Sequence, residues 1–192
     1  HLLKNLESWL GNLGECKIDG PDGQRDYRKE RALDGSKLPA YQGQPVRLEH
    51  RHLEPQQFEG IEWKRASEIY SEPSIFKDGI SPNDINQGAL GDCYFLAALS
   101  SLAEFPDRVK QMFVTKTINK AGIYLVKFFL NGQETPVIVD EHLPIGTNGK
   151  PCFATCRDNE LWVSLLEKAW AKLHGTYART EGGLPCFAAS HI

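Results

Sequence analysis

The sequence predicts an α+β fold, in which a helical body surrounds one central helix and a β-hairpin or small sheet lies beside it. Three observations lead to this prediction. Apolar residues recur at helical spacing from Cys93 to Ala103, directly after a loop that contains two glycines. Residues 122–139 contain two strand-like stretches joined by a tight turn. Residues 161–173 carry a wide apolar stripe, again at helical spacing.

Composition and charge place the chain among ordinary globular proteins. Hydrophobic residues make up 41% of the sequence and charged residues 24%, and 25 acidic against 22 basic residues give a net charge of −3. This balance gives no support to nucleic-acid binding. No apolar run approaches the roughly 18 residues that a membrane span needs. The chain begins with His1 and shows no signal-peptide pattern, so we expect a fragment or a processed product.

The cysteines indicate a reducing compartment. Their number is odd and their spacing is not that of a disulfide framework, so we expect an intracellular, cytoplasmic protein. A zinc site at Cys152, Cys156 and His142 is a minor alternative, because the spacing is loose and no fourth ligand is evident. The five cysteines are Cys16, Cys93, Cys152, Cys156 and Cys186.

The chain divides at about residue 60. Residues 1–59 are predicted to be an N-terminal extension or linker, because residues 14–59 are rich in Gly, Pro, Asp, Gln and Arg and show weak periodicity. Residues 2–13 have the pattern of a short amphipathic helix. We expect that helix to pack on the protein's own core, and a docking helix for another domain is the alternative. Residues 60–192 are predicted to form the folded part.

Short helices are predicted on both sides of the central helix. Residues 66–72 are expected to form a short helix, with Ile69 and Tyr70 directed inward. After the central helix, Pro106 fits the first position of another short helix, because proline lacks the N–H that this position leaves unused. The apolar face of that helix is formed by Val109, Met112 and Phe113.

A hairpin is predicted after these helices. Residues 122–130 alternate well enough for a strand, and residues 134–139 supply the returning strand. The dipeptide Asn131-Gly132 between them is the strongest short hairpin signal, because both residues tolerate the left-handed conformation of a tight turn. Pro136 lacks a backbone N–H, which favours an edge position for the returning strand.

The last clear element is the helix over residues 161–173. Asp158 or Asn159 is expected to cap its start with a side-chain oxygen. Gly175 is expected to end it, because glycine readily adopts the conformation that follows a helix. After Gly182-Gly183 and Pro185 the pattern stops at the end of the chain.

The loop before the central helix carries the candidate chemistry. Asp92 is expected to cap the helix with its carboxylate, so Cys93 lies at a helix N-terminus, where partial positive charge favours a thiolate nucleophile. Gly88 and Gly91 are expected to let the backbone approach a substrate. Gln87 carries an amide that can donate to an oxyanion near the sulfur. Together these residues favour nucleophilic acyl transfer over a buried, inert cysteine.

The segment Gln87–Ala98, Gln-Gly-Ala-Leu-Gly-Asp-Cys-Tyr-Phe-Leu-Ala-Ala, resembles the active-site segment of the calpain family, the papain-like calcium-dependent cysteine proteases. The resemblance extends over about residues 60–190. The family usually has Trp after the cysteine, and this chain has Tyr94, from which we expect altered packing rather than lost chemistry. Further matching stretches are Gly60–Arg65, Phe76–Gly79 with Asp84, Val137–Asp140, Leu143-Pro144, Asn159–Trp162 and Leu165–Lys172.

The resemblance implies that residues 60–192 form the first of two papain-like lobes, the nucleophile lobe of a calpain protease core. It carries over Gln87 and Cys93 as catalytic residues. In papain-like enzymes the histidine and asparagine follow the cysteine by about 130–150 residues, which lies beyond Ile192. None of the six histidines matches the family's Gly-His-Ala context. We therefore expect a chain truncated before the lobe that carries the histidine and asparagine.

The resemblance also implies calcium as a ligand. The matching positions are the carbonyls of Lys77 and Gly79 and the side chains of Asp84 and Glu160. Calcium prefers several oxygen ligands, some of them backbone carbonyls. No EF-hand pattern is present in the sequence.

The expected function is calcium-dependent cysteine endopeptidase activity on protein and peptide substrates, completed by a second catalytic lobe. By itself this chain is expected to be inactive, because no base accompanies the cysteine. A calpain-like regulatory or scaffold protein without catalysis is the alternative, against which the intact Gln87 and Cys93 speak. A different thiol acyl-transfer enzyme, such as a transglutaminase-like protein, is a third possibility that the calpain-like flanks disfavour.

Overall fold

Two helices, α4 (Cys93–Ala103) and α6 (Trp162–His174), form the centre of the protein. The structure is a computed structural model that describes residues 60–77 and 79–192, so the expectations for residues 1–59 lie outside the described part of the chain. The Phe95 ring of α4 stacks on the Trp170 ring of α6, with centroids 4.8 Å apart and planes 10° from parallel. Both side chains are fully buried. The predicted central helix starting at Cys93 is confirmed, and this stack places it against α6.

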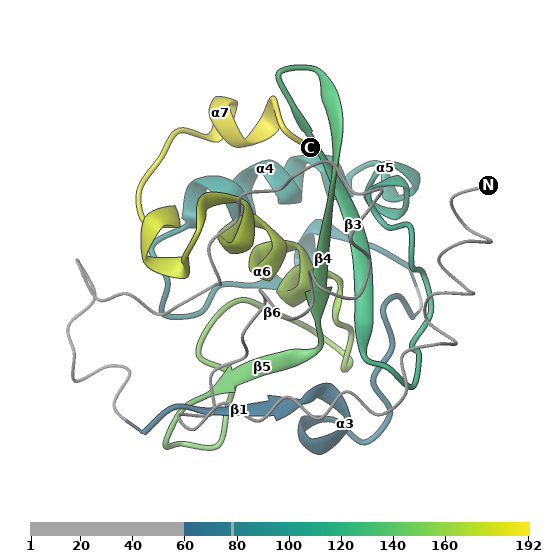
Figure 1. The fold of residues 1–192 in the computed structure, drawn as a ribbon, viewed down its shortest axis with the longest axis vertical. Helices are drawn as coiled ribbons and strands as arrows, with labels where there is room; N and C mark the ends of the chain where they lie inside the picture. The colour runs from purple at the N-terminus through teal and green to yellow at the C-terminus, as the bar shows by residue number, and fades with distance from the viewer. Residues whose placement is uncertain (1–59, 78) are drawn as a thin grey trace, which may run out of the picture.

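The hairpin of β3 (Ile123–Leu130) and β4 (Gln133–Asp140) lies beside these helices (Figure 1). Its two strands pair in antiparallel register from Ile123 with Asp140 to Leu130 with Gln133. The turn residues Asn131 and Gly132 have φ values of 52° and 74°, the left-handed pair that a two-residue hairpin turn requires. The predicted hairpin is therefore confirmed.

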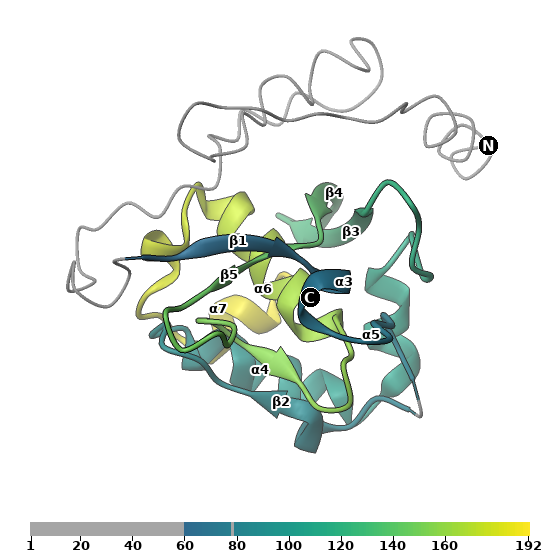
Figure 2. The same cartoon turned by 90° about the horizontal axis from the view of Figure 1, so that it is seen from below.

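Two short antiparallel sheets complete the fold. The first pairs β1 (Glu62–Arg65) with β5 (His142–Ile145), and the second pairs β2 (Ile85–Asn86) with β6 (Thr155–Cys156). In Figure 2, α6 lies between the first sheet and α4. Helices and small antiparallel sheets are mixed along the chain, so the predicted α+β class is confirmed.

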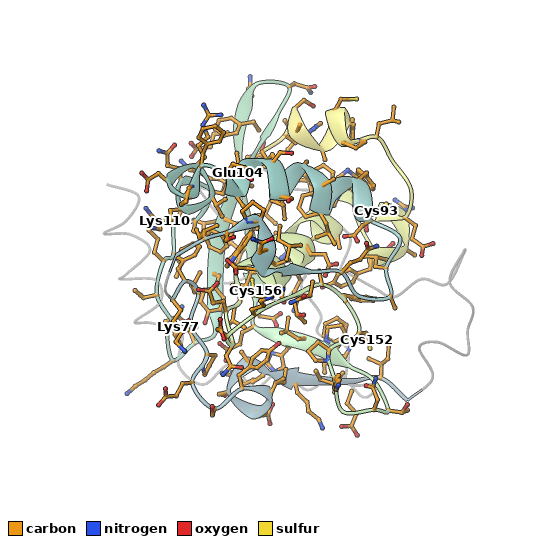
Figure 3. The ribbon with its side chains drawn as sticks, turned by 180° about the vertical axis from the view of Figure 1, so that it is seen from behind. Lys77, Cys93, Glu104, Lys110, Cys152 and Cys156 are labelled. Atoms are coloured by element: carbon orange, nitrogen blue, oxygen red, sulfur yellow. The ribbon has the colours of Figure 1, made fainter. Side chains whose placement is uncertain are left out.

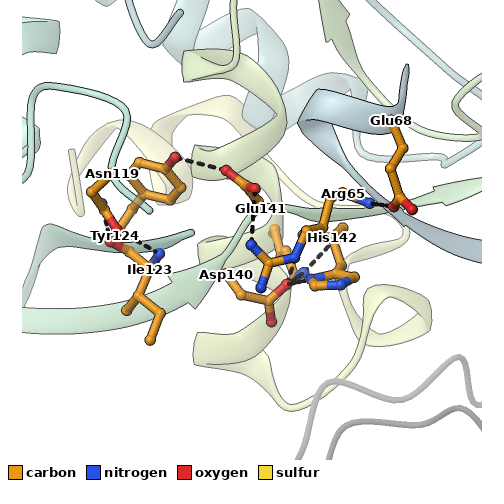
Figure 4. A network of polar contacts seen from close by, with 9 residues as sticks. Arg65, Glu68, Asn119, Ile123, Tyr124, Asp140, Glu141 and His142 are labelled. Atoms are coloured by element: carbon orange, nitrogen blue, oxygen red, sulfur yellow. Dashed lines mark hydrogen bonds and ion pairs between the residues drawn. The ribbon is translucent and has the colours of Figure 1, made fainter. Parts of the chain in front are cut away.

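A polar network joins the first sheet to the hairpin (Figure 4). The hydroxyl of Tyr124 in β3 donates to Oε2 of Glu141 at 2.9 Å, and Nη1 of Arg65 in β1 lies 3.6 Å from Oε1 of Glu141. Beside it, the side chain of His142 contacts Asp140, and Lys168 of α6 donates to Asp140 at 2.9 Å. Because these groups are buried or half-buried, the hydrogen bonds fix the β4–β5 corner against α6.

Short helices occupy the periphery, and one predicted cap is wrong. Residues 66–72 form only one helical turn, and Ile69 and Tyr70 do pack on the core. Asp158 and Asn159 do not cap α6, which begins at Trp162 after the N-cap residue Leu161; both instead adopt positive φ values in the preceding loop. No helix among the described residues is long and apolar enough to cross a membrane. The short helices are α3 (Ala66–Ile69), η2 (Pro82–Asp84), α5 (Pro106–Met112), η3 (Tyr177–Thr180) and α7 (Pro185–Ala189).

Candidate functional site

Cys93 is the first residue of α4, and its side chain is exposed. The helix begins when the backbone carbonyl of Asp92 accepts hydrogen bonds from the amides of Phe95 and Leu96, at 2.8 and 3.2 Å. The thiol of Cys93 makes no hydrogen bond or ion pair with another described residue. An exposed thiol at a helix N-terminus is accessible to a substrate and lies where the helix dipole favours negative charge.

The expected capping role of Asp92 is wrong. Its carboxylate makes no hydrogen bond to the first turn of α4, although its backbone carbonyl does. The side chain is fully buried and turned into the protein, where it meets Glu167 of α6. A cap oxygen has to stay beside the free amides of the first turn, and here the burial of the side chain prevents that.

The loop before Cys93 is fastened to the chain segment that precedes β6. The amide of Ala89 donates to the carbonyl of Cys152 at 2.8 Å. A Cβ atom added to Gly88 would lie within 2.5 Å of that same carbonyl oxygen, so this internal contact requires glycine. A Cβ atom added to Gly91 would make only an ordinary contact, with Glu181 at 3.8 Å.

Gln87 begins the same loop. Its side-chain Nε2 donates to the carbonyl of Leu90 at 3.1 Å, which closes the loop on itself. An amide NH₂ group has two hydrogens, so one N–H remains for another acceptor. Gln87 is exposed, as an oxyanion donor to a bound substrate has to be.

Tyr94 differs from the aromatic residue expected at this position, and the structure shows how it fits. Its hydroxyl accepts a hydrogen bond from Nε1 of Trp170 at 3.1 Å, and its ring lies against Gly183. Burial raises the pKa of the Tyr94 hydroxyl. The phenol therefore satisfies the one polar atom of the Trp170 ring at the contact between α4 and α6.

The four predicted metal-binding positions line one cavity. Lys77, Gly79, Asp84 and Glu160 surround a space of about 290 Å³. Figure 3 shows Lys77 on the opposite side of the molecule from Cys93. The other lining residues are Ile80, Ser81 and Asp158.

Backbone amides orient the two predicted carboxylates. The Ser81 amide donates to Oδ2 of Asp84 at 2.7 Å. Glu160 accepts from the Lys77 amide and, at 3.1 Å, from Nε1 of Trp162. Burial raises the pKa of Glu160, the Lys77 amide opposes this, and the charge of Asp84 adds to it. Each carboxylate oxygen has a second lone pair, so the donor set suits a hard cation such as calcium.

Asp158 was missed as a candidate for this cavity. It lies two residues before Glu160 and has a positive φ of 56°. Asp158 and Asp84 line the same cavity. The only signal in the sequence was the pair of acidic residues at spacing two. The described residues contain no cluster of three or more His, Cys, Asp or Glu side chains at metal-binding distance. This finding also removes the minor zinc alternative at His142, Cys152 and Cys156.

The described histidines have partners other than Cys93. His142 contacts Asp140 at 3.1 Å, and His174 bonds to the carbonyl of Trp170 at 2.9 Å. His191 bonds to the carbonyl of Phe187. Burial lowers the pKa of His174.

Comparisons with known proteins identify the family to which this chain is similar. The sequence profile described as "Calpain family cysteine protease" matches residues 39–190. The chain is 45% identical to Calpain-type cysteine protease DEK1 of Arabidopsis thaliana over 130 residues, which cover 64% of this chain and 6% of that protein. It is 41% identical to Calpain-5 of Caenorhabditis elegans over 140 residues, which cover 68% of this chain and 21% of that protein. It is 38% identical to Calpain-2 catalytic subunit of Homo sapiens over 151 residues, which cover 76% of this chain and 21% of that protein. The chain thus spans less than a quarter of the length of these relatives.

Proposed function

Because this chain belongs to the calpain family of cysteine proteases, we propose that it supplies the nucleophile lobe of a calcium-dependent cysteine endopeptidase that cleaves protein and peptide substrates. The observation that carries this proposal is the exposed thiol of Cys93 at the start of α4. In this role the sulfur attacks the carbonyl carbon of the scissile peptide bond, and the oxygen of that carbonyl gains negative charge.

Gln87 is the proposed donor to this developing oxyanion. Its bond to the Leu90 carbonyl holds the amide in one orientation and leaves one N–H unused. The loop that carries it is fixed by the hydrogen bond between Ala89 and Cys152. Because the donor is held in place before the substrate binds, little reorganisation is needed when charge develops.

The base is proposed to come from a second, papain-like lobe outside the described residues. Each described histidine is bonded to a group other than Cys93. Without a base to take the thiol proton and return it to the leaving amine, peptide cleavage stops before the amine leaves. We therefore expect the 192-residue chain alone to be inactive. An intracellular, cytoplasmic location remains a prediction from the cysteine pattern.

Calcium is proposed to bind in the cavity lined by Asp84 and Glu160, with the carbonyls of Lys77 and Gly79 as further ligands. When bound, it would neutralise the carboxylates of Asp84 and Glu160. Asp84 is followed directly by β2, whose partner β6 precedes Asp158 and Glu160. The β2–β6 pair therefore connects this cavity to Gln87, the residue that follows β2.

The nucleophile is tested in a longer protein that contains the second lobe. Cys93→Ser should abolish cleavage of a fluorogenic peptide, and Gln87→Ala should lower turnover by about 100- to 1,000-fold if it donates to the oxyanion. Cys186→Ser is the matched control, because Cys186 is also exposed. Cleavage that survives in Cys93→Ser, or that is lost equally in the control, would contradict the assignment. Inactivity of the unmodified protein would favour the regulatory or scaffold alternative.

Calcium binding is tested by calorimetry on the chain itself. Asp84→Ala and Glu160→Ala should each weaken binding, because each removes a charged oxygen ligand. Asp107→Ala and Glu104→Ala are matched controls on exposed positions outside the cavity. No heat of binding with the unmodified chain, or equal affinity in all four variants, would reject this site.

A further inference from the structure

Two acidic side chains meet in the interior directly behind the nucleophile. Asp92 precedes Cys93, and its side chain is 0% exposed; Glu167 in the middle of α6 is 2% exposed. Among the described residues, no N–H or O–H group makes a hydrogen bond to either carboxyl oxygen of Asp92. The group that faces it within hydrogen-bonding contact is the carboxyl of Glu167.

Two carboxylates in this position cannot both be ionised at low cost. An isolated buried charge is strongly disfavoured, and two like charges in contact add repulsion. One proton held between them removes both difficulties, because the protonated carboxyl donates its O–H to the ionised one. The pair then carries a single negative charge next to the N-terminus of α4, where the helix dipole stabilises it.

Glu167 also holds the segment to which the loop before Cys93 (residues 87–92, the nucleophile loop) is hydrogen-bonded. The amide of Ala154 donates to both oxygens of Glu167, at 3.1 Å each. The Ser164 hydroxyl, one turn earlier in α6, donates to the carbonyl of Ala154 at 2.8 Å. Ala154 follows Cys152, whose carbonyl accepts from the loop amide of Ala89. Glu167 thus lies between this segment, to which it is hydrogen-bonded, and the buried carboxyl of Asp92, which it faces.

We propose that Asp92 and Glu167 share one proton and position Cys93, by holding the first turn of α4 against α6 and the segment at Ala154. The inference rests on the proposed function in that Cys93 is the nucleophile being positioned. Neither carboxyl touches the substrate; both are positioning residues.

The surroundings of the pair favour retention of the proton. Burial raises the pKa of Asp92 to about 6, and the charge of Glu181 adds to this. Burial also raises the pKa of Glu167 well above its usual range, with the charge of Asp92 as the second cause. Tyr177 of η3 faces both acids and is itself kept neutral by burial. Lys168, the next residue of α6, donates to Asp140.

Because the pKa values of Asp92 and Glu167 are both raised, the stability that the pair contributes depends on pH with a definite sign. Both acids bind a proton more tightly in the folded state than in the unfolded state, so the stability they contribute is fully present below about pH 4 and falls as pH rises. The pair releases its protons in two steps, because the first carboxylate formed disfavours the second; burial raises the pKa of Asp92 to about 6 and the pKa of Glu167 well above its usual range. Above that second step two charges face each other, and the first turn of α4 should loosen.

The first test is infrared spectroscopy of the 192-residue chain at pH 7. A carbonyl band of a protonated carboxyl should be present in the unmodified chain and absent in Glu167→Gln. Glu181→Gln is the control, because Glu181 faces Asp92 without belonging to the pair, and its band should remain. Absence of the band in the unmodified, folded chain overturns the shared proton.

The second test is hydrogen exchange of the Phe95 and Leu96 amides, which bond to the Asp92 carbonyl. Glu167→Ala should lower their protection factors by about tenfold, the equivalent of one buried hydrogen bond. Glu167→Gln should restore protection, because its amide can donate to Asp92 and its oxygen can accept from Ala154. Protection should fall at alkaline pH in the unmodified chain and stay constant in Glu167→Gln. Equal protection in folded Glu167→Ala, or the same pH profile in both proteins, overturns the positioning role.

A third measurement separates this inference from the proposed function. In the longer protein, Glu167→Ala should lower kcat with little change in KM, and Glu167→Gln should recover most of the rate. If the longer protein does not cleave peptides at all, the protease proposal fails. The infrared carboxyl band and the pH profile of hydrogen exchange then still test whether Asp92 and Glu167 share a proton. If cleavage is intact in Glu167→Ala, the protease proposal stands and the positioning role is rejected.

Discussion

Gly88 offers the sharpest test of how the nucleophile loop is held. A Cβ atom at this position would lie within 2.5 Å of the Cys152 carbonyl oxygen and within similar distance of the Phe153 backbone. Carbon atoms in contact normally lie about 3.5–4.0 Å apart, so the loop in Gly88→Ala has to move by about 1 Å. That movement breaks the 2.8 Å hydrogen bond from Ala89 to Cys152.

The size of the effect follows from three contributions. Overpacking against rigid backbone costs about 1–3 kcal/mol, and the lost hydrogen bond costs about 0.5–1.5 kcal/mol. Replacing glycine reduces the entropy of the unfolded chain, which returns about 0.4–1 kcal/mol. The free energy of unfolding of Gly88→Ala should therefore fall by about 2 kcal/mol. With a urea m-value of about 2 kcal/mol per molar, the midpoint should fall by about 1 M.

Gly91→Ala is the matched control in the same loop. Its added Cβ meets Glu181 at 3.8 Å, an ordinary contact, so its urea midpoint should stay the same or rise slightly. Urea unfolding followed by circular dichroism measures both variants. The rate of Cys93 alkylation in each variant then reports whether the loop has moved. Equal midpoints for Gly88→Ala and Gly91→Ala would refute the argument that Gly88 is required by its contact with Cys152.

Two further predictions concern buried groups. Tyr94→Phe removes the acceptor of the buried Trp170 N–H, so its free energy of unfolding should fall by about 1–3 kcal/mol. Tyr70→Phe is the control, and its free energy of unfolding should change little, because the half-buried Tyr70 hydroxyl makes no hydrogen bond in the described part of the chain. Equal urea midpoints for the two variants would contradict this prediction. Iodoacetamide at pH 8 should label exposed Cys93 and leave Cys156 unlabelled, because Cys156 is 8% exposed and burial raises the pKa of its thiol. Mass spectrometry of the digested chain measures both sites, and early labelling of Cys156 would show that β6 opens readily.

Local patterns determined much of this fold. The hairpin depends on Asn131-Gly132, whose left-handed φ values are a property of those two residues. The start of α5 at Pro106 and the end of α6 at Gly175 have the same local origin. The start of α4 at Cys93 was predicted correctly as well, because it depends on the change from a glycine-rich loop to helical periodicity.

The errors arose where a side chain had two possible partners. Asp92 has the composition and position of a helix cap, and Asp158 or Asn159 has the same signal before α6. In the structure the burial of Asp92 against Glu167 excludes capping, and Asp158 lines the cavity beside Asp84. A sequence pattern indicates only the local interaction, here a helix cap. Whether Asp92 caps α4 or faces Glu167, 75 residues further along the chain, is decided by the tertiary contact.

By itself, the sequence determined the position of Cys93 at a helix start, because this depends on residue types at short spacing. Its resemblance to the calpain family indicated the family and the four positions that line the proposed calcium cavity. The tertiary structure decided how these parts are connected. Only the packing of α4 on α6 brings Asp92 to Glu167, and the β2–β6 pair brings the loop of Asp158 and Glu160 beside Asp84. The physical reason is that desolvation and close packing act between segments distant in the chain, so their effect on charge, strain and hydrogen bonding exists only after the chain has folded.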